Sequence, residues 1–440
     1  MWFVGQIIST NDQRDMRSKT MLQSVDMRCT VNRTHVKANL PSVLFLAIDL
    51  RTPGVPFAPS VSNRQALNIG LAIDCSGSMQ DDNKFEFAQK AAVSLVRQLR
   101  SADTISIVSF ETAARVEVPL TAATDTYFLE NAVAGIPMGK ETDLYEGLRL
   151  VWEQILPYAS RPGVVSRVIL LTDGEPTHGK TKDKDFVNLS EQIRQTGIPV
   201  TAIGVGPKYN ERLLMNIAQA TGSLWYHVSD PSFMSDIFVD EVTQMARTVV
   251  RSPLLTITAY DSTQILDAYT MKPMVTKLTL PSTSPRFDFR LKDIVSGEDQ
   301  TLFLRAKIAG RPPGQYPLVR AQLEGLSAEL TVTSTNDDQL AGIESDPYPR
   351  LLWVAGDGLT QVQRWIDGET KAKSEAETRM RTLISDASLP TVVRANPNLE
   401  TAVTQLRQVH EEATRVAPGS MSEDDKKRLR QKTTVLRRKK

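Results

Sequence analysis

Short apolar runs alternate with longer amphipathic stretches between residue 68 and about residue 250. Each apolar run is nearly continuous and rich in β-branched residues, Leu or Ala, which is typical of parallel strands covered by helices on both faces. The amphipathic stretches carry apolar residues at helical spacing. The pattern predicts a doubly wound α/β domain over residues 63–250, with central strands at residues 68–74, 104–110, 164–172 and 200–205.

Two shorter segments predict strands at the edges of this sheet. Residues 114–120 follow the second central strand closely enough to form an antiparallel hairpin with it, and residues 224–227 would add a last edge strand. Helices are expected in the intervals between the strands, at residues 84–99, 124–134, 144–158, 185–196, 210–221 and 231–249.

The pattern changes on both sides of the α/β domain. Residues 25–51 and 254–334 contain short strands separated by turns, with apolar and polar positions alternating most clearly in RFDFRL and AELTVTS. An N-terminal piece of two or three strands would be only marginally stable alone. We therefore expect residues 23–62 and 251–336 to form one β-sandwich into which the α/β domain is inserted, and the alternative is two unrelated β pieces.

Helical spacing returns in residues 337–418. It predicts helices at residues 348–365, 371–387 and 399–415, with Trp353 and Trp365 in the core of this region. Residues 1–22, at the other end of the chain, are expected to be disordered or to precede the true translation start.

Residues 419–440 form a basic, charged tail that contains Thr433 and Thr434. The first expectation is a solvated, disordered segment. The alternative is a regulatory segment, in which phosphorylation of either threonine creates an anion that an Arg-rich domain could recognise.

Composition narrows the class of protein. The chain has 440 residues, a formal net charge of +1 and 41% hydrophobic residues, as expected of a globular protein with more than one core. Cys29 and Cys75 are its only cysteines, which favours a reducing cytoplasm over a disulfide-stabilised secreted fold. The apolar runs are too short to span a membrane. The balanced charge and the lack of a recognisable nucleic-acid-binding pattern make nucleic acid an unexpected partner.

Candidate chemistry gathers where three predicted elements meet. Asp74 ends a buried strand, and Ser76 and Ser78 follow it before the next helix. Thr142 precedes another helix, and Asp173 ends another strand. Because ligands of open α/β sheets bind beyond the carboxyl ends of the strands, we expect these five side chains to lie close together.

These residue types suit a hard divalent cation. Mg²⁺ prefers about six oxygen ligands, and Mn²⁺ or Ca²⁺ are alternatives. The hydroxyls and the two carboxylates would leave the ion incompletely neutralised, so an Asp or Glu of a protein partner could complete its ligands. Gly77 is expected to let the loop curl so that the flanking hydroxyls face inward.

This arrangement resembles the von Willebrand factor A (VWA) family. Its metal-ion-dependent adhesion site (MIDAS) combines Asp-x-Ser-x-Ser with a later Thr and a later Asp, which corresponds here to Asp74, Ser76, Ser78, Thr142 and Asp173. The LLTDGE and AIGVG segments agree as well. The resemblance implies a metal-dependent protein-interaction module and no enzyme.

The wider layout is similar to that of bacterial, notably cyanobacterial, VWA proteins. The resemblance implies a cytoplasmic protein that acts beside an AAA+ ATPase or a Ser/Thr kinase and phosphatase system. Two alternatives remain open: a Mg²⁺-dependent phosphohydrolase with Asp74 as nucleophile, and a structural subunit whose metal stabilises a fixed assembly. The phosphohydrolase alternative is disfavoured, because the phosphatases that this motif resembles need a second Asp two residues after the nucleophile. This chain has Ser76 at that position.

Further polar residues surround the five candidates. Where many VWA relatives have Gly before the coordinating Thr, this chain has Glu141, and Asp143 follows; both could strengthen cation capture or point to solvent. Asp81, Asp82 and Asn83 are expected to cap the next helix, with a second ion site as the alternative. His178 is expected to be an exposed loop residue, because no set of nucleophile, base and orienting acid emerges. Cys75 is expected to be a packing residue, because no basic residue nearby in the sequence would lower the pKa of its thiol.

Overall fold

The computed structural model describes residues 25–52, 64–272, 275–278, 280, 284–415 and 421–434, so the expectation for residues 1–22 lies outside the described residues. The chain divides into two compact units. The α/β unit comprises Ala58–Arg251, Asp357–Ser385 and Thr401–Lys440, and the β unit comprises Met1–Phe57, Ser252–Gly356 and Asp386–Glu400. Among the described helices, none is both long enough and apolar enough to cross a membrane.

A six-stranded sheet forms the centre of the α/β unit. Its order is β6-β5-β4-β7-β8-β9, and all neighbours are parallel except β5 and β6. Each central strand is almost entirely buried, as its continuous apolar sequence predicts. The strands are β4 (Ala66–Asp74), β5 (Thr104–Phe110), β6 (Ala114–Ala122), β7 (Val164–Thr172), β8 (Val200–Val205) and β9 (Trp225–Val228).

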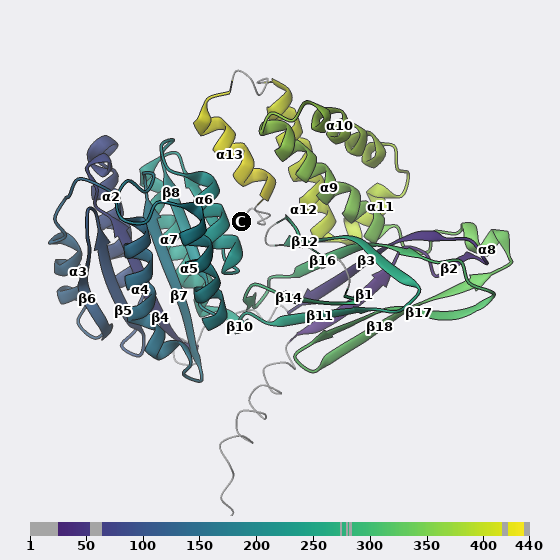
Figure 1. Ribbon diagram of the computed structural model, residues 1–440, viewed down its shortest axis with the longest axis horizontal. Coiled ribbons are helices and arrows are strands. Elements are labelled where there is room, and N and C mark those ends of the chain that lie inside the picture. Colours follow the sequence, from purple (N-terminus) through teal and green to yellow (C-terminus); the bar gives the residue numbers. More distant parts are fainter. Residues whose placement is uncertain are drawn as a thin grey trace, which may run out of the picture. The chain divides into compact units, whose positions relative to one another are not determined.

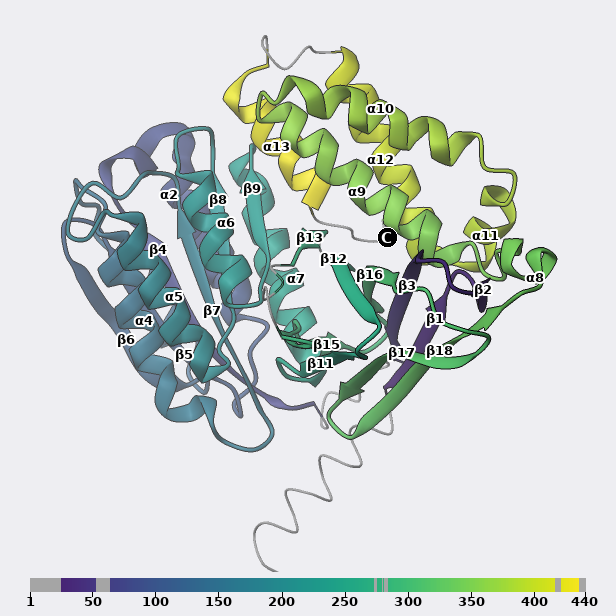
Figure 2. The same cartoon turned by 45° about the vertical axis from the view of Figure 1, so that its right-hand side comes forward.

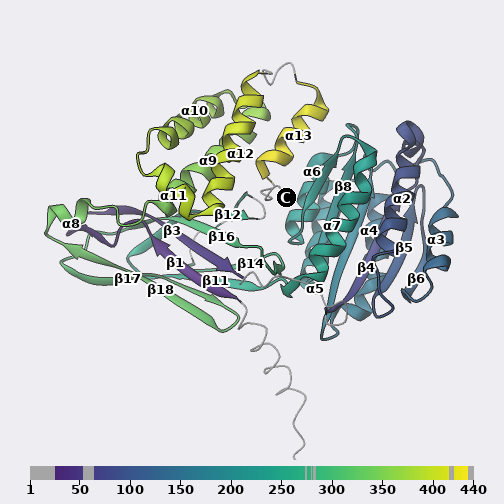
Figure 3. The ribbon, with the colours of Figure 1, turned by 180° about the vertical axis from the view of Figure 1, so that it is seen from behind.

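Helices cover both faces of this sheet, as Figures 1 and 3 show. One apolar core joins the sheet to α2 (Lys84–Val96), α3 (Thr126–Ala134) and α7 (Met234–Ala246). The other joins it to α4 (Leu144–Ala159), α5 (Asp183–Thr196) and α6 (Glu211–Ala220). Two short 3-10 helices, η1 (Gly77–Asn83) and η2 (Pro231–Phe233), precede α2 and α7. The doubly wound α/β fold is confirmed.

The β unit contains two five-stranded sheets, visible in Figure 2. The first has the order β1-β3-β16-β12-β13, and the second has the order β14-β11-β17-β18-β2. The short strand β15 (Ile294–Val295) of this unit belongs to neither sheet, and the α/β unit ends its first segment with the short strand β10 (Thr248–Val250). The strands of the first sheet are β1 (Asp26–Val31), β3 (Ser42–Arg51), β16 (Gln300–Ile308), β12 (Thr263–Lys272) and β13 (Thr276–Lys277). Those of the second are β14 (Arg286–Arg290), β11 (Leu254–Ala259), β17 (Gly314–Leu323), β18 (Leu326–Thr335) and β2 (His35–Lys37).

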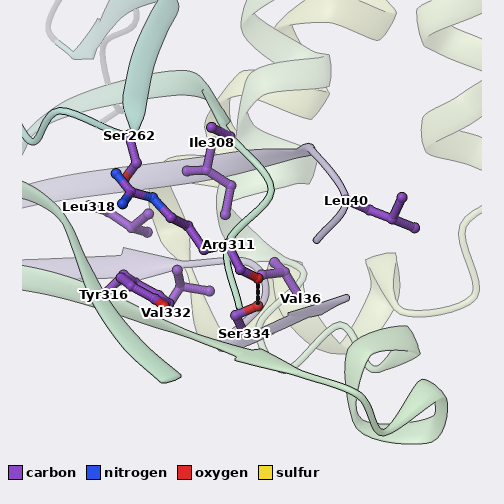
Figure 4. A pocket seen from close by; sticks show the side chains of 10 residues that line it. Val36, Leu40, Ser262, Ile308, Arg311, Tyr316, Leu318, Val332 and Ser334 are labelled. Atoms are coloured by element: carbon purple, nitrogen blue, oxygen red, sulfur yellow. Dashed lines mark hydrogen bonds between the residues drawn. The ribbon is translucent and has the colours of Figure 1, made fainter. Parts of the chain in front are cut away.

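N-terminal and later strands are interleaved in both sheets. β3 lies between β1 and β16, with Leu46 opposite Leu304, and β2 pairs with β18. Figure 4 shows apolar side chains of both sheets meeting around a small cavity, among them Val36, Ile308 and Leu318. The segments on either side of the α/β domain therefore build one sandwich, and the alternative of two unrelated pieces is wrong.

Helices follow the sandwich in sequence. They are α8 (Asp338–Gly342), α9 (Tyr348–Ile366), α10 (Thr370–Ile384), α11 (Leu389–Ala395) and α12 (Pro397–Arg415), of which the short α8 and α11 were not expected. Trp353 is buried, packs against Phe45 with ring centroids 5.4 Å apart, and donates a hydrogen bond to Asp267. Trp365 is buried too, with its ring 6.1 Å from that of His410. Both tryptophans are core residues, as their apolar positions indicate.

The expectation of a disordered tail is wrong for the last described segment. Glu423–Thr434 forms helix α13, which packs within the α/β unit. Lys427 is buried, and its Nζ donates to the carbonyl oxygens of Pro207 and Tyr209, each at 2.7 Å. Leu429 and Thr433 are buried as well. The charged composition hid this docking, because long cationic side chains can bury their methylenes while their charges find partners. The side chain of Thr434 and residues 435–440 lie outside the described residues.

Candidate metal site

Asp74 lies at the carboxyl end of β4 and is fully buried. Its Oδ1 accepts a hydrogen bond from the Ser76 amide at 2.8 Å, and its Oδ2 accepts one from Thr172 Oγ1 at 2.5 Å. Burial raises the pKa of the Asp74 carboxyl to about 6, although these hydrogen bonds act in the opposite direction. The carboxylate is thus held rigidly in a setting where its negative charge is poorly compensated.

Ser76 and Ser78 connect the Asp74 carboxylate to the Asp173 carboxylate through hydrogen bonds. Ser76 Oγ lies 3.2 Å from Ser78 Oγ, and Ser78 Oγ donates to Asp173 Oδ1 at 2.7 Å. Ser76 and Asp173 are buried, and Ser78 is half-buried. Four of the five expected residues therefore form one connected group at the carboxyl ends of β4 and β7.

Thr142 reaches the same group from the loop before α4. Its amide donates to Thr177 Oγ1 at 2.9 Å, which ties this loop to the loop after β7. A Cβ placed on Gly174 would lie 3.5 Å from Thr142 Oγ1 and 3.7 Å from Ser78 Oγ. The two hydroxyls therefore border a space that is kept free of any side chain at position 174.

Backbone contacts hold the loop after β4 against the loop before α4. The Gly77 amide donates to the Lys140 carbonyl at 3.2 Å, and the Gly139 amide donates to the Cys75 carbonyl at 2.7 Å. Gly77 does not adopt a left-handed conformation, so the expectation of a glycine-dependent curl is wrong. Asp82 and Asn83 have positive φ angles of 56° and 55° instead, and they turn the chain into α2.

Two residues that contact the candidate ligands, Thr172 and Lys84, were not predicted from the sequence. Thr172 holds Asp74, and its only signal was its place beside Asp173 at the end of a strand. Lys84 is buried, with its Nζ 2.7 Å from Asp173 Oδ2. Its signal was a cation at the first position of a helix, where the helix dipole disfavours positive charge.

The surrounding acids act locally. Asp143 caps α4 by accepting a hydrogen bond from the Glu146 amide at 3.1 Å, and burial raises its pKa. Glu141 and His178 form an exposed pair with 2.8 Å between Glu141 Oε2 and His178 Nδ1. His178 is thus an exposed loop residue, as expected.

The segment before α2 differs from the expected cap. Asn83 makes no side-chain capping hydrogen bond, and Asp81 lies 3.6 Å from Lys208 at the surface. The capping expectation is wrong because the left-handed backbone at Asp82 and Asn83 replaces a side-chain cap.

Cys75 is buried, burial raises the pKa of its thiol to about 12, and it packs beneath the loop as expected.

The residues fit a hard cation. Within the described part of the chain, no group of three or more His, Cys, Asp or Glu side chains is arranged to hold a metal, so a site of the zinc-finger type is absent there. The group around Asp74 offers instead two carboxylates and three hydroxyls, which are oxygen donors of the kind that Mg²⁺, Mn²⁺ and Ca²⁺ accept. The absence of a side chain at Gly174 leaves two of these hydroxyls, those of Thr142 and Ser78, without a Cβ in van der Waals contact with them at this position.

Residues 68–240 match the family described as von Willebrand factor type A domain. The α/β unit thus contains a VWA domain. Domains of this family are known for metal-dependent protein–protein interactions.

Solved structures resemble most of the chain. A structure described as von Willebrand factor type A from Catenulispora acidiphila aligns with 94% of this chain and 97% of its own length, with a TM-score of 0.69 and 17% identity. The ArnB paralog VWA2 from Sulfolobus acidocaldarius aligns with 93% of this chain and 98% of its own, with a TM-score of 0.59 and 18% identity. At these identities the likeness concerns the fold, and it extends beyond the VWA domain.

Curated relatives carry little functional information. The uncharacterized Escherichia coli protein YfbK is 27% identical over 187 residues, which are 42% of this chain and 32% of YfbK. The uncharacterized Synechocystis protein sll0103 is 26% identical over 299 residues, which are 66% of this chain and 67% of that protein. The chain thus spans about a third of YfbK and about two thirds of the Synechocystis protein.

Proposed function

We propose that this protein binds a divalent cation, Mg²⁺ or alternatively Mn²⁺ or Ca²⁺, through a MIDAS and uses it to grip an Asp or Glu of a protein partner. The proposed ligands, direct or through water, are Asp74, Ser76, Ser78, Thr142 and Asp173. The connected hydrogen bonds from Asp74 through Ser76 and Ser78 to Asp173 carry the proposal. A bound cation would supply positive charge and open coordination positions for the partner's carboxylate.

The chain's own residues prepare this contact. Ser76 and Thr172 orient the Asp74 carboxylate, and Ser78 orients that of Asp173. Thr177 fixes the loop that presents Thr142. Side chains held by packing and hydrogen bonds keep a binding site close to its working geometry without further ordering cost.

The phosphohydrolase alternative is less well supported. A nucleophilic Asp must reach its substrate, whereas Asp74 is fully buried and both of its oxygens accept hydrogen bonds. We propose that the protein is not an enzyme. A phosphatase assay of the wild type and of Asp74→Asn tests this, and Asp74-dependent turnover would favour the alternative.

For the cellular setting we propose a cytoplasmic bacterial assembly, in which the VWA domain serves an AAA+ ATPase or a Ser/Thr kinase and phosphatase system. The similarity to uncharacterized proteins of Escherichia coli and Synechocystis supports a bacterial setting. A purely structural subunit would differ in one respect, because its assembly would persist when chelator is added.

The experiment is an affinity pull-down in Mg²⁺ and in excess chelator. Asp74→Ala and Ser76→Ala are expected to abolish capture of the partner while circular dichroism stays native-like. Ser94→Ala, which removes a hydroxyl bonded to the Lys90 carbonyl on α2, is the matched control and should bind normally. Undiminished capture in chelator would exclude the proposed function.

A further inference from the structure

Lys84 places a buried positive charge beside the proposed metal site. Its side chain is 6% exposed, and its Nζ lies 2.7 Å from Asp173 Oδ2. The same ammonium lies 3.4 Å from the Ser78 carbonyl oxygen. Gly206 lies beside the end of this side chain, because a Cβ added to it would lie 3.6 Å from Lys84 Cε, and Lys84 as a whole is buried. The ammonium is therefore held in place beside one of the two carboxylates.

The formal charges of the site show what this ammonium does. Asp74 and Asp173 contribute two negative charges when ionised, and Lys84 offsets one of them. A divalent cation would bring the group to a net charge of +1, and one carboxylate from a partner would return it to neutrality. Without Lys84, the cation alone would already give neutrality. Because charges interact strongly in a buried site, this difference affects both binding steps.

We propose that Lys84 couples the binding of the cation to the binding of the partner's carboxylate, an inference that rests on the proposed function. Lys84 weakens the binding of the cation alone, because it already pairs with Asp173 and repels a second cation. It increases the gain in cation affinity that an incoming carboxylate produces, because the carboxylate neutralises the excess positive charge. The coupling is reciprocal, so the cation promotes carboxylate binding by the same factor. Lys84 acts through Asp173 and through charge, as a positioning residue.

The test measures Mn²⁺ affinity by electron paramagnetic resonance, without and with saturating acetate as the carboxylate probe. Lys84→Met, which keeps an unbranched apolar side chain and removes the charged ammonium, should bind Mn²⁺ at least tenfold more tightly than the wild type without acetate. The increase in Mn²⁺ affinity that acetate produces should be smaller in Lys84→Met than in the wild type. Lys90→Met is the matched control: Lys90 lies on the same helix, exposed and paired with Glu86, and its loss should change neither quantity.

Thermal unfolding gives a second measurement that does not depend on acetate. In chelator, Lys84→Met leaves the buried Asp173 carboxylate without its ammonium, so its midpoint should fall below that of the wild type. Mn²⁺ should raise the midpoint of Lys84→Met by more than it raises that of the wild type. If the variant folds only with Mn²⁺, its folding as Mn²⁺ is added replaces the midpoint shift as the measured quantity.

The outcomes separate the two proposals. If Lys84→Met binds Mn²⁺ no more tightly than the wild type, the proposed role of Lys84 is wrong, and the proposed metal site is unaffected. Folded wild-type protein that binds no Mn²⁺, with Asp74→Ala identical to it, would overturn the metal site and this inference together.

Discussion

At the scale of single residues, burial determines the chemistry of the proposed metal site. Asp74 and Asp173 are both fully buried, but they are stabilised differently. Among the residues that the structure describes, the hydrogen-bond donors to Asp74 are neutral, namely Thr172 and the Ser76 amide, whereas Asp173 has a hydroxyl and the Lys84 ammonium. The site therefore combines one poorly compensated carboxylate with one that is paired with a cation.

The raised pKa of Asp74 predicts a pH dependence of stability in chelator. The folded pKa of about 6 lies above the ordinary value of 3.8, so the folded state holds a proton that the unfolded chain has already lost between these values. The stabilising contribution of the protonated carboxyl is fully present below about pH 4 and is lost as the pH rises through 6. The loss is on the order of 3 kcal/mol, because one pKa unit corresponds to about 1.4 kcal/mol.

Urea unfolding of the wild type and of Asp74→Asn between pH 4 and pH 8 measures this effect. The neutral amide cannot ionise, so Asp74→Asn should become progressively more stable relative to the wild type as the pH rises, and the difference should level off above pH 7. A stability difference that does not change with pH would show that Asp74 does not titrate in this range.

At the scale of elements, charged groups decide the placement of α13. Besides the two carbonyl contacts of Lys427, Asp424 Oδ1 lies 3.0 Å from His227 Nε2, and Arg430 pairs with Glu211 and Asp367. Buried cations with specific partners orient an element strongly, since any other placement leaves a buried charge unpaired. Phosphorylation of Thr433 would require α13 to detach, because this side chain is 1% exposed.

Lys427→Met should loosen α13. The substitution keeps most of the apolar part of the side chain but removes the hydrogen bonds to the Pro207 and Tyr209 carbonyls. The buried Tyr209 carbonyl loses this donor, at a cost of about 1–3 kcal/mol. Hydrogen exchange of the α13 amides should accelerate at least tenfold. Lys426→Met is the control, because Lys426 pairs only locally with Glu423 and its loss should leave exchange in α13 nearly unchanged. Equal protection in both variants would mean that Lys427 does not hold the helix.

At the scale of the whole molecule, the VWA domain is an insertion in the sequence of the β unit. β16 pairs with β3 along the whole length of β16, from Ser42 opposite Ile308 to Leu50 opposite Gln300. The buried Asp49 accepts hydrogen bonds from Thr301 and Tyr348, so the N-terminal strand also joins strand and helix residues far away in the chain. The β unit therefore requires both flanks of the insertion.

Deletion of residues 25–52 should destabilise the β unit but not the VWA domain. It removes β1, β2 and β3 and one side of the Asp49 contacts, so strands β11 to β18 should lose protection against limited proteolysis. The VWA domain has its own two apolar cores and should remain resistant. Mass spectrometry of the fragments distinguishes these results, and an intact protease-resistant β11 to β18 fragment would contradict the prediction.

The sequence by itself determined the strands, helices and order of the VWA domain, because continuous apolar runs and helical spacing are local patterns that burial enforces. It also indicated the segments that supply Asp74, Thr142 and Asp173, since strand ends meet at one edge of a parallel sheet. Only the tertiary structure decided the pairing of Lys84 with Asp173, the support of Asp74 by Thr172 and the docking of α13 through Lys427. These contacts join charged and polar groups across loops, and no periodicity in the chain records which partner each one meets.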